Sequence, residues 1–282
     1  MQYSNGEDGG AFQRAVACDD WHVGVREVTM GSLTEALAEV SMECEASMEL
    51  EVCSVRVLVV HLGSGGEEHI MVLNVHHIAT DGWSTEYLMG DVVSAYNALA
   101  GGGSVDVGVD VGLRYADYAQ WQHDMLSDEE RMKPHEQYWR EMLGGELAVL
   151  ELQTDHPRPA VITSNGGSVE VCIDATSSAG LLSLCRECGV TMMRGALAVW
   201  AVTLSKHSGQ DEVVVGTPYA NREHPATHSV VGYFVNTLAI RVRVDGMVSF
   251  RESLMHVSGA MNEAVAHAVV PFMRVLEVMS LP

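Results

Sequence analysis

Two adjacent histidines, His76 and His77, are the residues of this sequence best placed to do chemistry. The β-branched, apolar run before them, Ile70 to Val75, predicts a strand that reaches the pair. Asp81 and Gly82 follow in a short turn. Because the unperturbed pKa of histidine is about 6.5, an imidazole at the end of this strand could accept or donate a proton near neutral pH.

Three interpretations of the histidine pair are open from the residues alone. The pair could be buried and satisfied within the core, it could bind a metal ion, or it could supply an acid or base at the mouth of a tunnel. A metal site would need further ligands, and no convincing cluster of cysteines or carboxylates lies nearby in the sequence, so we expect no metal. Since neighbouring strand residues face opposite sides, one histidine should face a cavity while the other braces the turn.

The elements around the pair predict how it is held. Apolar runs at 52–62 and 70–76, joined by a glycine-rich turn at 63–67, predict a hairpin that delivers the histidines. A helix should begin near Ser84, the candidate N-cap, and run to about Ala100. The positive end of that helix disfavours an imidazolium at His77, which favours the neutral ring.

Asp81 and Gly82 have separate expected roles in the turn. The Asp81 carboxylate can accept hydrogen bonds from its own loop or pair with a distant arginine. Gly82 supplies the backbone freedom that a tight turn needs.

The remaining pattern predicts a mixed α/β protein with two parts. Residues 1–20 are expected to be loop. Helices are expected at 33–48, 115–125, 128–143, 177–188, 191–207 and 249–266, and strands at 168–173, 213–216 and 239–244. Prolines and glycines at 153–167 predict a linker, which divides the chain into an N-terminal part, 1–152, and a C-terminal part, 168–282.

Composition narrows the class of protein further. The chain has 282 residues, 47% of them hydrophobic, and a formal net charge of −22 from 16 basic and 38 acidic residues. Such an acidic balance argues against a nucleic-acid partner, because phosphate contacts need a basic surface. No apolar run approaches the roughly 20 residues that span a bilayer, and the N-terminus is polar, so we expect no membrane partner and a cytoplasmic location.

The six cysteines are scattered, which is typical of reduced thiols. Cys185 and Cys188 form a CxxC pair, but it has no second pair and lies in a predicted helix. Zinc or redox chemistry at this pair is therefore not favoured.

Several segments, in the same order along the chain, resemble one protein family. Residues 76–82, HHIATDG, resemble the HHxxxDG signature of nonribosomal peptide synthetase condensation domains, which chloramphenicol-acetyltransferase-like acyltransferases share. The family's YxDYxxWQ, GxPxANR, GFFVNTL and HQDxPFE segments are similar to residues 115–122, 216–222, 231–238 and 267–272, although the last keeps only the histidine and Pro-Phe. The resemblance runs from about residue 50 to 281, and the family's first and closing motifs are missing, as in a domain cut at both ends.

The resemblance implies a fold and a reaction. The fold would be two chloramphenicol-acetyltransferase-like lobes, each a mixed β-sheet with helices, forming a V around a tunnel with His77 midway. The activity would be amide formation in secondary metabolite biosynthesis, between a carrier-bound acyl or aminoacyl thioester and an aminoacyl acceptor. The partners would be donor and acceptor carrier proteins and an adjacent adenylation domain. No cofactor would be bound by the chain itself, since the carrier proteins bring the 4'-phosphopantetheine.

The resemblance also implies roles for single residues. His77 would accept the amine proton or orient the amine, and His76 would be structural. Asp81 would hold the loop through a salt bridge with Arg222, or alternatively Arg241, and Gly82 would let backbone N–H groups approach the thioester. Trp83, Ser84 and Asn236 would contact substrate, although Asn236 could equally brace a strand.

Other functions within this superfamily and outside it remain as alternatives. An epimerisation domain shares HHxxxDG but is not expected to carry the form at 231–238, and heterocyclisation domains have aspartate in place of the histidines. A coenzyme-A-dependent acyltransferase would use the same histidine. The non-enzyme alternative is a truncated, inactive domain that docks carrier proteins, and activity of these 282 residues alone is an open point.

Overall fold

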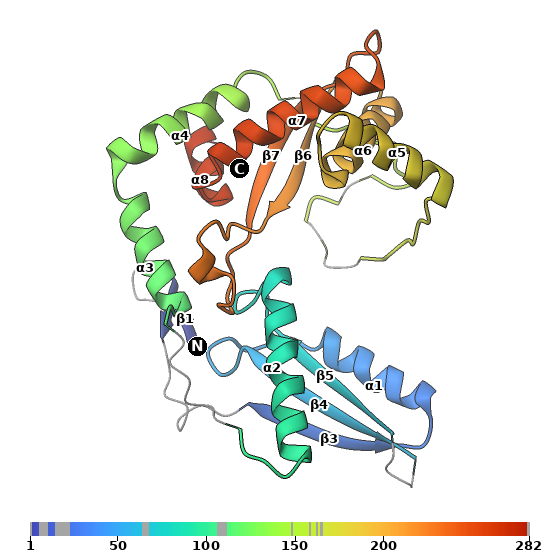
Figure 1. Cartoon of the computed structure of the whole chain (residues 1–282), viewed down its shortest axis with the longest axis vertical. Coiled ribbons are helices and arrows are strands. Elements are labelled where there is room, and N and C mark those ends of the chain that lie inside the picture. Colours follow the sequence, from blue (N-terminus) through green and yellow to red (C-terminus); the bar gives the residue numbers. More distant parts are fainter. Residues whose placement is uncertain are drawn as a thin grey trace. The chain divides into compact units, whose positions relative to one another are not determined.

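The computed structural model describes residues 2–5, 11–14, 23–63, 68–105, 112–147, 149–157, 159–161, 163 and 166–280. Helices and strands are both present, in a mixed α/β arrangement (Figure 1). The chain forms two compact units. The first comprises Met1–His123 and Arg222–Phe234, and the second comprises Asp124–Asn221 and Val235–Pro282.

A three-stranded sheet forms the centre of the first unit. Its order is β3 (Gly24–Met30), β4 (Val55–Leu62), β5 (Glu68–Val75), with β3 parallel to β4 and β4 antiparallel to β5. Val55 pairs with Val75, so β5 ends one residue earlier than the sequence predicts, and both histidines lie beyond it. Residues 64–67 of the predicted hairpin turn lie outside the described residues.

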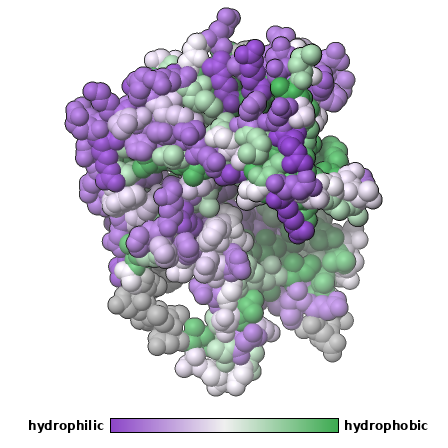
Figure 2. All heavy atoms as spheres, turned by 45° about the horizontal axis from the view of Figure 1, so that its top comes forward, coloured by the Kyte–Doolittle hydropathy of each residue, from purple (hydrophilic) through white to green (hydrophobic). Residues whose placement is uncertain are grey.

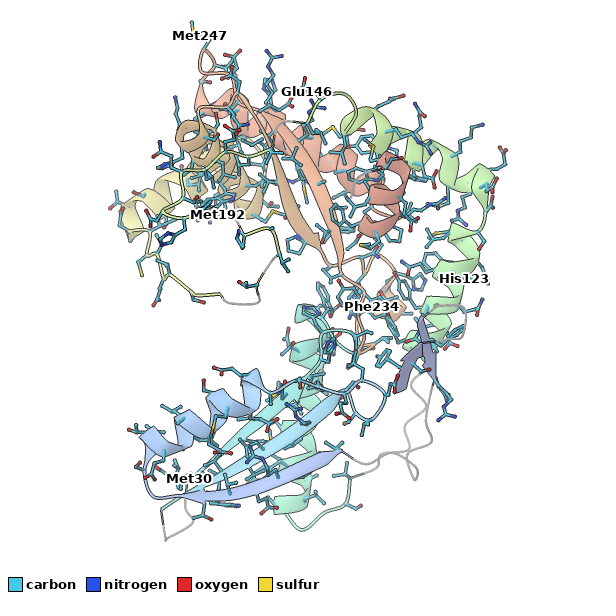
Figure 3. The ribbon with its side chains drawn as sticks, turned by 180° about the vertical axis from the view of Figure 1, so that it is seen from behind. Met30, His123, Glu146, Met192, Phe234 and Met247 are labelled. Carbon is cyan, nitrogen blue, oxygen red and sulfur yellow. The ribbon has the colours of Figure 1, made fainter. Side chains whose placement is uncertain are left out.

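Helices α1 (Leu33–Glu45) and α2 (Gly82–Ala100) lie on opposite faces of this sheet (Figures 1 and 3). Alternate residues of β4 face α1, where Ala36, Leu58 and Val60 are fully buried. At the edge of the same face, the Glu43 carboxylate accepts from Arg56 Nε at 2.7 Å. The sheet therefore has one well-packed face that fixes the strand leading to the histidines.

A short antiparallel hairpin, β1 (Gln2–Asn5) with β2 (Ala11–Arg14), corrects the expectation that residues 1–20 form only loop. Each strand has only four residues and carries polar side chains. A run this short does not show the alternation of apolar and polar residues that marks a strand. In Figure 1, β1 lies beside the start of α3 (Tyr115–Leu126).

The second unit contains the larger hydrophobic core. Strand β6 (Glu212–Tyr219) pairs antiparallel with β7 (Asn236–Arg243). Within the part of this unit that the structure describes, the helices are α4 (Glu129–Met142), α5 (Ala175–Glu187), α6 (Met192–Ser208), α7 (Phe250–Ala266) and α8 (Phe272–Met279). The largest side chains buried in the core include Trp139, Leu238, Ile240, Leu254 and Val257. Most predicted helices are present with boundaries shifted by a few residues.

The predicted strand at 168–173 is wrong for the described residues. No strand is assigned there, and Val169, Val171 and Ile173 are 90%, 78% and 68% exposed. Alternating β-branched residues favour an extended chain, but a strand also needs a hydrogen-bonded neighbour, and none of the described strands pairs with this segment.

The compact units divide the chain at positions other than the predicted linker 153–167, part of which lies outside the described residues. Helix α4 precedes that linker, yet Trp139 packs in the core of the second unit and its indole Nε1 donates to His267 O at 3.1 Å. The 1–152 and 168–282 boundaries stay a prediction about lobes.

Cys185 of the CxxC pair packs inside this second core. It is 1% exposed, and a Cβ added at Gly195 would lie 2.4 Å from its sulfur. Gly195 therefore permits the close approach of α5 and α6, and packing accounts for this cysteine.

Both hydrophilic and apolar residues reach the face shown in Figure 2, and hydrophilic ones cover most of it. Among the described residues, no single helix has the length and apolarity for a membrane crossing. Helices α5 and α6 satisfy that test only when taken together, and they are bent by 113°.

Candidate functional site

His76 is held in the turn between β5 and α2 by three hydrogen bonds. Its backbone N–H donates to Ser54 O at 2.9 Å, and its carbonyl accepts from Ala79 N at 2.9 Å. Its ring Nδ1 accepts from Ile78 N at 3.0 Å. The ring therefore braces the loop through a bond that requires Nδ1 to be unprotonated.

His77 presents an exposed ring at the same turn. The rings of His77 and Tyr233 form a T-shaped pair, with centroids 5.4 Å apart and an interplanar angle of 77°. The backbone carbonyl of Tyr233 accepts from the Tyr115 hydroxyl at 2.7 Å, which fixes the tyrosine in turn. This arrangement leaves His77 accessible while an aromatic side chain limits its orientation.

Asp81, and not the predicted Ser84, is the N-cap of α2. The helix begins at Gly82, and the Asp81 carboxylate accepts from Ser84 N at 2.8 Å. It also accepts from Ser84 Oγ at 2.7 Å and from Phe234 N at 3.0 Å. A carboxylate three residues before Ser84 can reach the free N–H groups of the first turn, so Ser84 becomes the capped residue.

The structure contains the ion pair between Asp81 and Arg222. Arg222 Nη2 lies 3.0 and 3.2 Å from the two carboxylate oxygens, and the side chains are 1% and 2% exposed for Arg222 and Asp81. Arg222 also donates to Val230 O at 2.7 Å and to Thr227 O, and its guanidinium lies 3.9 Å from the centre of the Phe234 ring. This pair joins the histidine loop to residues 222–234.

Arg241, the alternative partner, lies in the second unit. It pairs with Glu212 at 2.7 Å and donates to Gly144 O at 2.8 Å. Arg241 therefore links β6, β7 and the end of α4.

Burial alone would raise the pKa of the Asp81 carboxyl. Hydrogen bonds from Ser84 and from Phe234 N, together with the charge of Arg222, outweigh that effect and hold the pKa below its ordinary value. Asp81 is therefore a carboxylate at neutral pH, which suits an anchor better than a proton donor.

Ser84 is fully buried and its hydroxyl is engaged. Arg222 Nη2 donates to the hydroxyl oxygen at 2.6 Å, and Gly232 N donates to it at 3.2 Å. This geometry favours a bracing role over substrate contact.

Asn236 is engaged in the same way within the second unit. Its amide donates to Ala268 O and Val270 O at 2.8 Å each and accepts from Phe272 N at 3.0 Å. These bonds attach β7 to the segment before α8, which favours the strand-bracing alternative for this residue.

Gly82 and Trp83 lie at the exposed first turn of α2. Nothing lies within 4 Å of a Cβ added at Gly82. Trp83 is 43% exposed, and its indole Nε1 donates to His228 O at 3.0 Å. Among the predicted contact residues of the first unit, Trp83 is thus the accessible one, whereas Ser84 is not.

An open pocket of about 580 Å³ adjoins the histidine loop in the first unit. Its lining comes from the β1–β2 hairpin, the segment after α1, the loop residue Ile78, and two tyrosines, and comprises Tyr3, Ser4, Phe12, Gln13, Met48, Leu50, Glu51, Ile78, Tyr115 and Tyr233. Tyr3 donates to Ile78 O at 3.3 Å, which ties the hairpin to the loop. Within the described ranges, no group of three or more metal-ligating side chains is present.

The sequence did not single out the pocket or the contacts of residues 228–234. The form GYFVN within 231–238 was the available signal, because it contains the glycine and aromatic residues that surround Asp81 and His77. Figure 3 shows Phe234 where this segment meets the loops of the first unit.

The comparison with protein families agrees with this geometry. The sequence model described as the condensation domain matches residues 1–281, which extends the resemblance over the first 50 residues. The chain belongs to the condensation-domain family.

Curated relatives are peptide synthetases by name. Malpinin synthetase of Mortierella alpina is 38% identical over 216 residues, which is 77% of this chain and 3% of that protein. The phosphinothricin tripeptide synthetase PhsC of Streptomyces viridochromogenes is 36% identical over 216 residues, which is 75% of this chain and 19% of that protein. Surfactin synthase subunit 1 of Bacillus subtilis is 34% identical over 221 residues, which is 78% of this chain and 6% of that protein. The chain thus spans a small part of these relatives.

Solved structures share the fold. The X-domain from teicoplanin biosynthesis superposes with a TM-score of 0.88 at 25% identity, over 100% of this chain and 62% of that one. The condensation domain of the Monacolin K polyketide synthase MokA gives 0.73 at 22% identity, over 92% and 58%. The predicted mixed α/β, chloramphenicol-acetyltransferase-like fold class is confirmed.

Proposed function

We propose that this chain is the part of a nonribosomal peptide synthetase that forms an amide bond between a carrier-bound acyl or aminoacyl thioester and a carrier-bound aminoacyl acceptor. The observation that carries the proposal is the accessible ring of His77 on a loop held by a buried ion pair, Asp81 with Arg222. Membership of the condensation-domain family supports the same activity.

The chemistry asks for positioning and one proton acceptor. The acceptor amine attacks the thioester carbonyl carbon, the new C–N bond forms, and the C–S bond breaks. The amine nitrogen loses a proton and the leaving sulfur finally gains one. His77 accepts the amine proton or holds the amine in line, and general-base help is worth roughly 10²–10⁴-fold. A thioester is already activated, so positioning supplies much of the remaining rate.

The first turn of α2 supports the oxyanion in this proposal. N–H groups at a helix N-terminus carry partial positive charge, and an exposed glycine at Gly82 lets a substrate oxygen approach them. Such donors stabilise the charge that develops on the thioester oxygen in the transition state.

Donor and acceptor carrier proteins, each with a 4'-phosphopantetheine arm, are the proposed partners, together with an adjacent adenylation domain. The names of the relatives support this setting, although the whole-protein activity belongs to chains many times longer. A cytoplasmic location stays a prediction.

The test is product formation by the parent synthetase with the substitution His77→Ala. Donor and acceptor carrier proteins loaded with defined aminoacyl groups are mixed with the enzyme, and the condensed product is quantified by mass spectrometry. Turnover should fall at least about 10²-fold. His69→Ala, on β5 of the same hairpin, is the matched control and should retain turnover. Undiminished condensation by His77→Ala would refute the role of this ring.

A second candidate function is docking of another protein without catalysis. The observation that favours it is the TM-score of 0.88 to the teicoplanin X-domain, whose structure was also solved in a complex with OxyB. If docking is the function, the wild-type parent binds its partner but forms no product from loaded carriers. An additional arm with a free coenzyme-A thioester and the same acceptor distinguishes a coenzyme-A-dependent acyltransferase.

A further inference from the structure

We propose that the pocket beside the histidine loop receives the side chain of the donor substrate, whose thioester carbonyl is attacked. We propose further that this side chain is apolar and of aromatic size. This inference rests on the proposed function, because it assigns the substrate class of the same site. The volume of about 580 Å³ falls within the range of roughly 300–1,000 Å³ that is usual for small-molecule sites.

The walls of the pocket are mainly apolar and aromatic. Phe12 and Tyr233, both in the lining, are 55% and 43% exposed, so their rings are available to a ligand. Met48 and Leu50 add aliphatic surface. Among the described residues of this lining, Glu51 is the charged one, and none of them is a lysine or arginine. An anionic side chain would lose hydration without gaining a cation, whereas an apolar one gains by leaving water.

Two residues connect the pocket to the reacting position. Ile78 follows His77 directly in the loop, and Tyr233, which lines the pocket, forms a T-shaped ring pair with His77. A substrate whose side chain occupies the pocket would thus bring its carbonyl to the neighbourhood of His77. Because Tyr233 touches the His77 ring and lines the pocket, it is a positioning residue for both the imidazole and the substrate side chain.

Two tyrosines of the pocket lining, Tyr3 and Tyr115, are held as neutral donors. Tyr115 donates to Tyr233 O and Tyr3 donates to Ile78 O. Burial, together with its neighbours, raises the pKa of Tyr115 to about 12. Since these hydroxyls already donate to backbone carbonyls, they offer little to the two amide groups of a pantetheine arm. The pocket therefore suits a side chain better than the arm.

The experiment measures binding to the 282-residue chain by isothermal titration calorimetry. The probes are stable pantetheine amide analogues that carry phenylalanine, alanine or glutamate, with pantetheine alone as reference. The phenylalanine analogue should bind at least about tenfold more tightly than the other three probes. Phe12→Ala should remove most of that preference. Ser4→Trp, which adds bulk at an exposed position of the lining, should remove it without altering the core.

Tyr96→Ala is the matched control, because Tyr96 is a 71% exposed aromatic residue of the same unit outside the lining. Its preference should equal that of the wild type. Equal affinity for the phenylalanine and alanine analogues, or a preference that survives both pocket substitutions, would overturn the proposal.

Failure of the pocket and failure of the proposed function are distinguishable. Binding requires no condensation, so a chain with side-chain discrimination but no turnover retains the pocket and loses the catalytic proposal. If turnover depends on His77 but the probes bind equally, the catalytic proposal is retained and the pocket proposal is lost.

Discussion

Substitution of Asp81 by alanine should destabilise the first unit strongly. The Asp81 and Arg222 side chains are 2% and 1% exposed, and the Asp81 carboxylate is the countercharge of the Arg222 guanidinium. Removal of one partner leaves the guanidinium charge buried and uncompensated, which costs about 3–5 kcal/mol. At about 2–4 °C per kcal/mol for a chain of this size, the melting temperature should fall by roughly 10 °C.

Asp174→Ala is the matched control for the cap itself. Asp174 is the N-cap of α5 and accepts from Ser177 N and Ser177 Oγ, as Asp81 accepts from Ser84, but its carboxylate is exposed. The free energy of unfolding should therefore fall less in Asp174→Ala than in Asp81→Ala. The difference between the two variants measures the buried pair rather than the helix cap.

A double-mutant cycle with Arg222→Ala completes the measurement by urea denaturation. Because Asp81→Ala with Arg222→Ala removes both buried charges, the double variant should lose less stability than the sum of the single losses. Additive losses, or an Asp81→Ala loss no larger than that of Asp174→Ala, would refute the reasoning about the buried charge.

Two further predictions concern packing and pH. Gly232→Ala should cost about 1–3 kcal/mol in urea denaturation, because its Cβ would lie 2.2 Å from the Tyr115 ring. Gly259→Ala, a helix position with nothing within 4 Å, should not destabilise, and an unchanged midpoint for Gly232→Ala would contradict the clash. Burial and the neighbouring His267 lower the pKa of His135, so the unfolded state binds more protons as pH falls through about 6.5. The contribution of His135 to the free energy of unfolding should be fully present above that pH and be lost as the pH falls below it. His135→Gln should therefore reduce the dependence of the unfolding free energy on pH, measured from pH 8 to 5.

The sequence was sufficient for elements whose signal is local. Runs of β-branched residues predicted β4 and β5, and helical spacing predicted α3, α4, α6 and α7 within a few residues. The partner of Asp81 was also predictable, because Arg222 ends a segment that resembles a family motif. For the helices and strands, the decisive residues lie in one stretch of chain.

Other features that depend on distant segments were not predictable. Ser84 has the residue type of an N-cap, but Asp81 reaches the same N–H groups because Arg222 and Phe234 N hold its carboxylate in place. The segment 168–173 has strand propensity without a paired neighbour among the described strands. The contact between Tyr233 and His77 comes from a loop more than a hundred residues away and leaves no local pattern.

The bond between Asp81 and Arg222 also sets an order of events during synthesis. The two residues are 141 positions apart, so at about 5–20 residues per second the arginine leaves the ribosome roughly 7–28 s after the aspartate. During that interval, the sheet and α1 can already form from residues that have emerged. The nascent loop with its two imidazoles lacks the countercharge that fixes it, and the loop is therefore fixed only after Arg222 has been synthesised.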